Sequence, residues 1–340
     1  MKIKLMITGL AVAGGVMTAL AEVLIADPSI LRDGGKYYLI GTQYPDVGIG
    51  GNVTGAEDPV FPILESTDLH SWRWTDTEAG KGRILRRENA FADKRFWAPQ
   101  LLKHGGKYYF AYTADFHWGI AVADTLAGEF KPLAEFPRPG KGQQIDPFLF
   151  VDDDGKVYAY YSGRGIEGVE LSSDLKKFIG DPVTCIVRDQ DWEKLPLETC
   201  YEELNRKFGY KNWSAYRASE WVTEGPTVIK RGGKYVLFYS SNDFRSPDYC
   251  VGAAVAERPL GPWKKLQSAA VLSREHTGFN GTGHGDIFVG EDGALWYVFH
   301  AHHSGIKIDP RRTGVIRFKE TFGADGFPRY EAEPDTMRLL

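Results

Sequence analysis

The stretch GGKYYFAYT at residues 105–113 decides the fold, because four other parts of the chain repeat it. Each copy opens with a glycine turn, continues as a strand rich in Tyr, Val and Phe, and follows a second short apolar strand. Two strands joined by a tight glycine turn form a β-hairpin. The other copies are GGKYYLIGT (34–42), DGKVYAYYS (154–162), GGKYVLFYS (232–240) and DGALWYVFH (292–300).

The distance between copies leaves room for two more strands after each hairpin. Five units of about four strands each are typical of a β-propeller, so we predict an all-β, five-bladed propeller. No Pro-rich or Gly/Ser-rich linker divides the chain, and residues 22–340 are expected to form one domain. The longest interval contains an insertion at 188–223, where helical spacing over 198–208 predicts a short helix between blades 3 and 4.

The first 21 residues are typical of a secretory signal peptide. Lys2 and Lys4 precede an apolar stretch at 5–20, and Ala19 and Ala21 form a small-x-small cleavage pattern. That stretch is too short for a membrane span. We therefore predict a periplasmic or secreted protein without a membrane-spanning segment.

Composition excludes several classes of protein. The chain has 340 residues, 43% of them hydrophobic, and a formal net charge of −4. No basic surface is expected to recruit nucleic acid, and a monomer is the simplest expectation. Three cysteines, at 185, 200 and 250, cannot build a disulfide framework, and free thiols are expected.

Carboxylates recur at one position of the repeat. About nine residues before each turn glycine stand Asp27, Ala98, Asp146, Glu224 and His284. Equivalent positions of a radial repeat face the axis, so Asp27, Asp146 and Glu224 are predicted to converge. Asp before Pro is also a common turn former, but three acids in register favour a catalytic site. Two carboxyls with separated pKa values can cleave a glycosidic bond as acid and base.

The motifs around these residues resemble those of glycoside hydrolase family 43 in order and spacing. The resemblance implies a five-bladed propeller and an inverting mechanism. It assigns Asp27 as general base, Glu224 as general acid, and Asp146 as the residue that orients the acid and tunes its pKa. The motifs are ADP (26–28), FWAPQ (96–100), IDP (145–147), TEGP (223–226) and TGHGDIF (282–288).

Substrate contacts are expected from aromatic residues and an arginine on the same face. Trp97, Phe116 and Trp118 are candidate surfaces for stacking a sugar ring. The resemblance implies an arginine that binds sugar hydroxyls, at Arg311 or Arg312, and counting back from the DGFP turn at 325–328 favours Arg312.

His284 occupies the axial position of the fifth blade. The resemblance implies that it faces either a calcium ion or a water cluster at the axis. The nearby His300, His302 and His303 lack a further ligand at a usual zinc spacing, so they are interpreted as scaffold. No cofactor is expected for the chemistry itself.

The predicted function is therefore an inverting glycosidase that acts on an oligosaccharide or polysaccharide. It is expected to remove terminal α-L-arabinofuranosyl, β-D-xylosyl or galactosyl units from plant-type glycans. The insertion at 188–223 should wall the active-site face, which predicts exo action. Two alternatives stay open: a propeller that binds glycans without catalysis, and a propeller glycoside phosphorylase.

Overall fold

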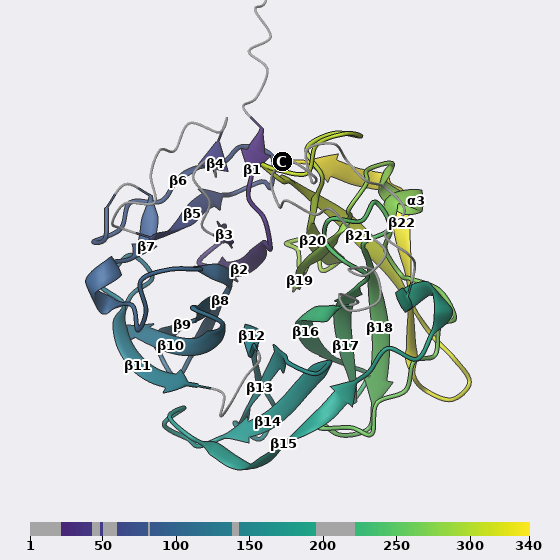
Figure 1. Ribbon diagram of the computed structural model, residues 1–340, viewed down its shortest axis with the longest axis horizontal. Coiled ribbons are helices and arrows are strands. Elements are labelled where there is room, and N and C mark those ends of the chain that lie inside the picture. The colour runs from purple at the N-terminus through teal and green to yellow at the C-terminus, as the bar shows by residue number, and fades with distance from the viewer. Residues whose placement is uncertain (1–21, 43–47, 50–59, 81, 138–142, 195–221) are drawn as a thin grey trace, which may run out of the picture.

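The computed structural model describes residues 22–42, 48–49, 60–80, 82–137, 143–194 and 222–340. It is a five-bladed propeller, with the blades arranged around a central axis (Figure 1). The all-β prediction and the five hairpins are confirmed. In the described part of the chain no helix is long and apolar enough to cross a membrane.

Each blade is an antiparallel sheet whose strands follow chain order from the axis outward, and blade 2 runs in order from β8 to β11. Blade 1 contains β2 (Ser29–Asp33), β3 (Lys36–Ile40), β5 (Val60–Ser66), β6 (Arg73–Trp74) and β7 (Arg83–Leu85), and blade 2 contains β8 (Trp97–His104), β9 (Lys107–Ala114), β10 (His117–Ala123) and β11 (Lys131–Phe136). Blade 3 contains β12 (Ile145–Val151), β13 (Val157–Ser162), β14 (Ile166–Leu171) and β15 (Phe178–Ile186), and blade 4 contains β16 (Thr223–Arg231), β17 (Lys234–Ser241) and β18 (Cys250–Ala256). Blade 5 contains β19 (Gly283–Val289), β20 (Leu295–Ala301), β21 (Arg312–Phe322) and β22 (Pro328–Leu339).

Blade 4 departs from the expected four strands. Its sheet has three, and single-residue pairings of β18 with Leu272 and Lys264 extend its outer edge. The described helical segments are short: α3 (Arg274–Thr277), η1 (Arg87–Asn89) and η2 (Asp191–Lys194). The predicted helix at 198–208 lies outside the described residues, as do Cys200 and the first 21 residues. Cys185 and Cys250 are free thiols.

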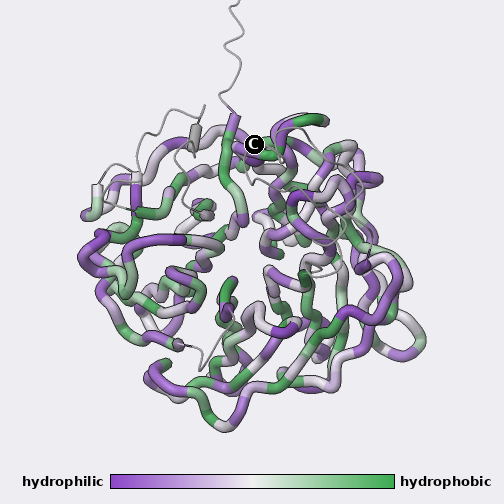
Figure 2. The backbone as a smooth tube through the Cα atoms, in the orientation of Figure 1, coloured by the Kyte–Doolittle hydropathy of each residue, from purple (hydrophilic) through white to green (hydrophobic). Residues whose placement is uncertain are grey.

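The N-terminal segment closes the ring against the last blade. β1 (Val23–Leu24) pairs with β4 (Gly48–Ile49), and the backbone N–H of Val23 donates to the Leu340 carbonyl at 2.7 Å. Thr313 on β21 donates its hydroxyl to the Ile25 carbonyl at 2.8 Å. Hydrophobic layers fill the spaces between blades, while the outer turns are mostly hydrophilic (Figure 2).

One residue at the start of each inner strand has left-handed backbone geometry. It is followed by proline in the first four blades and by Gly285 in the fifth. Four of these sites interrupt the strand register as β-bulges. Non-glycine residues adopt positive φ at a cost of order 1–3 kcal/mol, a strain that tends to gather at functional sites. The five residues are Asp27 (φ 50°), Ala98 (38°), Asp146 (56°), Gly225 (58°) and His284 (36°).

This geometry corrects one expectation. We predicted Glu224 at the axial position of blade 4, but that position belongs to Gly225, and Glu224 precedes it by one residue. A Cβ on Gly225 would lie 2.7 Å from Cδ2 of His284, so the histidine ring occupies the space that a side chain would need. Glu224 therefore approaches the site from a different direction than the two aspartates do.

A ring of hydrogen bonds joins the blades at the same level. At the end of the second strand of every blade, a Ser, Thr or His side chain accepts the backbone N–H of the next blade's axial residue. The five bonds are Ala98 to Thr42 (2.9 Å), Asp146 to Thr113 (2.9 Å), Gly225 to Ser162 (3.2 Å), His284 to Ser240 (2.8 Å) and Asp27 to His300 (3.1 Å).

Candidate active site

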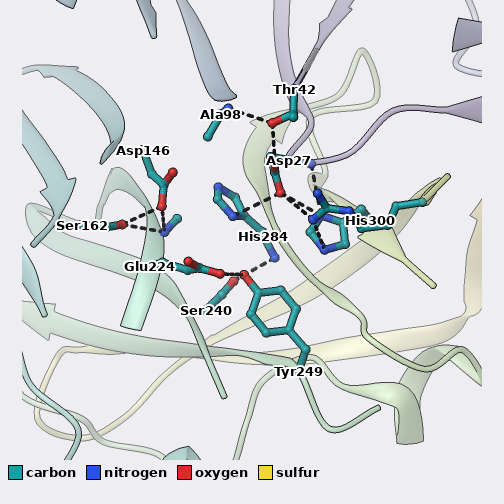
Figure 3. A network of polar contacts seen from close by, with 12 residues as sticks. Asp27, Thr42, Ala98, Asp146, Ser162, Glu224, Ser240, Tyr249, His284 and His300 are labelled. Carbon is teal, nitrogen blue, oxygen red and sulfur yellow. Dashed lines mark hydrogen bonds and ion pairs between the residues drawn. The ribbon is translucent and has the colours of Figure 1, made fainter. Parts of the chain in front are cut away.

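Asp27 is surrounded by cations and donors (Figure 3). Its Oδ1 lies 3.0 Å from Nη1 of Arg311, 3.4 Å from Nδ1 of His284 and 3.2 Å from Nδ1 of His300, and the Thr42 hydroxyl donates to its Oδ2. Burial by itself would raise the pKa of Asp27, but the charge of Arg311 and then that of His284 outweigh it and hold this pKa well below its usual value. Asp27 is therefore a carboxylate at any ordinary pH.

Glu224 has the opposite surroundings. Among the described residues, Tyr249 donates its phenol proton to Oε1 of Glu224 at 2.7 Å, and no Lys or Arg pairs with this carboxyl. Burial, and then the negative charge of Asp146, raise the pKa of Glu224 to about 7. A carboxyl of this kind keeps its proton near neutral pH.

Asp146 stands between these two extremes. Ser162 donates to its Oδ2 at 2.8 Å, and the Gly225 N–H lies 3.4 Å from the same oxygen. Burial raises the pKa of Asp146, while His284 and Ser162 oppose the rise. Because Asp146 accepts two donors and Glu224 accepts one, the proton that the pair shares is better placed on Glu224.

His284 lies among all three acids (Figure 3). Burial lowers its pKa, but the charges of Asp27, Asp146 and Glu224 outweigh burial and the net direction is upward. His300 behaves differently, because burial and then the charge of Arg311 lower its pKa to about 3 and keep it neutral. The predicted convergence of the acids is thus accompanied by one histidine that favours a positive charge.

A cavity of about 390 Å³ opens over these groups. Asp27, Asp146, Glu224, His284 and Arg311 line it together with Trp97 and Phe116, whose rings meet edge to face at 5.6 Å. A second cavity of about 510 Å³ adjoins it, and Gln143, Val222 and Glu224 line both. Glu224 consequently stands between the two spaces.

Trp118 does not belong to the site. It is 0% exposed and stacks on Phe136 at 4.1 Å in the hydrophobic layer between blades 2 and 3, whereas Phe116 is 39% exposed. Phe116 lies in the turn before β10 with a left-handed φ of 73°, whereas Trp118 is the second residue of β10, so strand alternation does not relate the directions of the two side chains. Trp118 is a core residue rather than a sugar-stacking surface.

The arginine that lines the cavity is Arg311, not Arg312 as expected. Arg312 pairs with Glu22 and lies 5.1 Å from the ring centroid of Phe279, outside the cavity, while Arg311 is buried against Asp27. Successive residues of an extended chain point to opposite sides, so the two arginines separate.

Sequence reasoning missed several residues that line the cavity or support it. Phe244, Asp243 and Arg245 lie on the loop after β17, where Arg245 donates from Nε to Asp243 Oδ1 at 2.6 Å. Tyr249 donates to Glu224, Thr42 and Ser162 donate to Asp27 and Asp146, and Ser240 accepts the His284 N–H. The ring residues were visible in the sequence as the last letter of each repeat, but the loop residues follow no repeat.

The histidines after β20 point to different partners. His302 Nε2 lies 2.8 Å from the Phe244 carbonyl, and His303 Nδ1 lies 3.2 Å from the Pro310 carbonyl. Within the described ranges, no three His, Cys, Asp or Glu side chains are grouped to hold a metal ion. Calcium beside His284 would therefore rest mainly on water and backbone oxygens.

Comparisons with known proteins agree with this geometry. Residues 19–328 match the model of the family described as glycosyl hydrolases family 43. A β-xylosidase from Xylanibacter ruminicola is 28% identical over 62% of this chain and 66% of its own length, and a xylosidase/arabinosidase from Bacteroides ovatus is 25% identical over 81% and 85%. The crystal structure of a thermostable family-43 glycoside hydrolase is 31% identical, with a TM-score of 0.70 over 92% of this chain and 94% of that one. This chain therefore belongs to glycosyl hydrolase family 43 and is a glycosidase.

Proposed function

We propose that the protein is an inverting, exo-acting glycosidase in which Asp27 is the general base and Glu224 the general acid. The observation that carries this proposal is the opposite ionisation of two carboxyls on one cavity. Asp27 is held as a carboxylate by Arg311, whereas Glu224 has a pKa of about 7. Inverting hydrolysis needs these two states at once.

The position of Glu224 supports its part in the reaction. A general acid must reach the glycosidic oxygen, which joins the sugar being removed to the leaving group. Glu224 lines both adjoining cavities, so one can hold the terminal sugar above Asp27 and the other the leaving group. Trp97 and Phe116 offer an apolar wall for the first sugar.

The reaction follows from these roles. Asp27 takes a proton from a water molecule, and the water oxygen bonds to the anomeric carbon. Glu224 gives its proton to the glycosidic oxygen as the bond between that oxygen and the anomeric carbon breaks. Asp146 supplies negative charge that keeps Glu224 protonated. Because water enters opposite to the leaving group, the configuration inverts.

We further propose terminal β-D-xylosyl or α-L-arabinofuranosyl units as substrates, with galactosyl units as a third class. The names of the relatives from Xylanibacter ruminicola and Bacteroides ovatus support the first two. Exo action is supported by the insertion, whose described residues Arg188 and Val222 line the cavity beside Glu224, while residues 195–221 lie outside the described residues. Export by the N-terminal segment, a monomeric state and calcium near His284 are part of the same proposal.

Anomer-resolved NMR during hydrolysis tests the mechanism. The 4-nitrophenyl glycosides of β-D-xylose, α-L-arabinofuranose and β-D-galactose form the substrate panel. The first product of a cleaved β-D-xyloside should be α-D-xylose, and net retention would refute the mechanism. Product analysis on a linear xylan or arabinan tests exo action, for which early monosaccharide with little loss of viscosity is expected.

The same assay separates the alternatives. A glycan-binding propeller would bind oligosaccharides and release nothing from any substrate of the panel. A phosphorylase would require inorganic phosphate and yield a sugar phosphate. The cavity favours hydrolysis, because both of its arginines already pair with carboxylates, Arg311 with Asp27 and Arg245 with Asp243.

A further inference from the structure

We propose that Tyr249 is a positioning residue that fixes which oxygen of Glu224 carries the acid proton. The phenol donates its hydrogen bond to Oε1 of Glu224, so the proton that passes to the glycosidic oxygen is carried by Oε2. The inference rests on the proposed role of Glu224 as general acid and concerns the orientation of that acid.

Tyr249 is held rigidly beside the acid (Figure 3). The side chain is fully buried, and its ring lies nearly parallel to that of His300, with centroids 5.6 Å apart and 9° between the planes. On Gly283 a Cβ would lie 2.6 Å from Cδ1 of Tyr249, so the ring uses the space that this glycine leaves open. The phenol has no room to swing away from Glu224.

The direction of the hydrogen bonds is set by a backbone amide. The His284 N–H can only donate, and it donates to Oγ of Ser240 at 2.8 Å. The Ser240 hydroxyl also acts on the phenol of Tyr249: it opposes the rise that burial causes in the pKa of that phenol, which is the effect of a donor on the phenol oxygen. With its oxygen accepting the amide, Ser240 has one proton to give, and giving it to Tyr249 leaves the phenol proton for Oε1 of Glu224.

The reverse direction is disfavoured. If Glu224 donated to the phenol and the phenol to Ser240, the serine proton would need another acceptor. The contacts of the described residues provide none. A buried hydroxyl without an acceptor costs about 1–3 kcal/mol. Oε1 therefore accepts the phenol in both protonation states of the acid.

Comparison with the other blades explains why a tyrosine is needed. In blades 1 and 3 the Thr or Ser hydroxyl that takes part in the inter-blade ring of hydrogen bonds also donates directly to the axial carboxylate. Thr42 donates to Asp27 and Ser162 donates to Asp146. In blade 4 the axial residue is Gly225 and the acid lies one position earlier. In this blade the phenol of Tyr249 gives Glu224 the hydroxyl contact that Asp27 and Asp146 receive from Thr42 and Ser162.

This contact has a consequence for the rate. As the proton leaves Oε2 for the glycosidic oxygen, negative charge develops on the Glu224 carboxylate. A hydrogen bond to an ionised acceptor is stronger than one to a neutral acceptor, so the phenol stabilises the transition state more than the bound substrate. Losing it should lower kcat more than it changes KM.

The variant Tyr249→Phe tests the proposal on the panel glycoside that the wild type cleaves fastest. The alkaline limb of the kcat–pH profile reports loss of the proton from the general acid. Without the phenol donor the carboxylate of Glu224 is less stable, so this limb should move to higher pH by about one unit. At the optimum, kcat should fall by roughly tenfold with KM nearly unchanged. A fall in kcat with an unmoved alkaline limb would overturn the proposal.

Tyr239→Phe is the matched control. Tyr239 also lies in blade 4, and its phenol donates to a buried carboxylate, Glu193, at 2.7 Å. That glutamate pairs with Lys265 and is not among the residues that line either cavity. The control should leave both limbs of the profile in place, and a shift equal to that of Tyr249→Phe would count against a specific effect.

A second measurement needs no turnover. In protein carrying a ¹³C label at the glutamate δ-carbons, the Glu224 signal is assigned by its loss in Glu224→Gln and then titrated. Its midpoint should rise in Tyr249→Phe, and in Ser240→Ala to a smaller extent if Tyr249→Phe does not fold. An unchanged midpoint would overturn the role of Tyr249.

These results separate the two proposals. If Glu224→Gln retains the alkaline limb, Glu224 is not the general acid and the proposed function fails. If Glu224→Gln removes the limb but Tyr249→Phe leaves the limb and the ¹³C midpoint in place, only the positioning role fails.

Discussion

Asp27 and Glu224 are the same kind of group on the same cavity, yet their surroundings drive their pKa values apart. Both are withdrawn from water, which by itself favours the neutral acid. Asp27 has Arg311 at 3.0 Å and Nδ1 of His284 at 3.4 Å, and its pKa is depressed. Glu224 has a phenol and a neighbouring carboxylate, and its pKa rises to about 7. Burial raises the pKa of both carboxyls, and the partners of each decide whether that effect is outweighed, as at Asp27, or reinforced, as at Glu224.

Their places in the repeat differ as well. Asp27 occupies the strained axial position and receives the hydroxyl of its own blade, Thr42. Glu224 stands one residue before the axial Gly225 and is served by Tyr249 from outside the repeat. The proposed base thus occupies a position that every blade repeats, and the proposed acid does not.

Removing either carboxyl should produce the largest effect. Asp27→Asn and Glu224→Gln keep the size of the side chains but cannot take or give the proton. Each should lower kcat/KM on xylo- or arabino-oligosaccharides by about 10²–10⁴-fold. Steady-state assays measure this, and a loss below about tenfold in either variant would break the comparison.

Removing the cation beside the base should have the next largest effect. Arg311→Met leaves the burial of Asp27 less opposed, so its pKa should rise by about 1–3 units. Because the base works only when ionised, the acid limb of kcat/KM should move to higher pH. Arg312→Met is the control, since that side chain pairs with Glu22 and should leave the acid limb in place.

Asp146→Asn sharpens the other side of the comparison. The amide still accepts hydrogen bonds but removes the negative charge that raises the pKa of Glu224. The alkaline limb should then move from about pH 7 to lower pH, by about one unit, opposite in direction to Tyr249→Phe. An alkaline limb that stays in place would mean that burial alone sets the pKa of Glu224.

The smallest effect is expected from the hydroxyl of the base. Thr42→Val removes both the acceptor for the Ala98 N–H and the donor to Asp27, while Thr113→Val removes the acceptor for the Asp146 N–H. Each should cost about 1 kcal/mol in free energy of unfolding. Only Thr42→Val should also move the acid limb of the kcat/KM–pH profile to higher pH, by a few tenths of a unit. The same acid limb in both variants would contradict a role for the Thr42 hydroxyl in holding Asp27 ionised.

The sequence predicted the parts of the site that the repeat carries. The hairpins located Asp27, Asp146 and Glu224 near the axis, and the resemblance to the family assigned their roles. The offset of Glu224 could not be seen, because it depends on a left-handed bulge that Gly225 and the ring of His284 impose together. The burial of Trp118 follows a left-handed turn at Phe116, and the exchange of Arg312 for Arg311 depends on which side of an extended chain faces the cavity. That orientation is decided by packing between blades, which no single repeat encodes.

The most direct test of the acid and base assignment is the leaving-group dependence of Asp27→Ala and Glu224→Ala. Activity is compared on two glycosides of the same sugar, one with a 2,4-dinitrophenyl leaving group that needs no proton and one with an alkyl leaving group that does. The account predicts that Glu224→Ala retains substantial activity on the dinitrophenyl glycoside and loses it on the alkyl glycoside, while Asp27→Ala loses both. The reverse pattern, or equal losses in Glu224→Ala on both substrates, would contradict it.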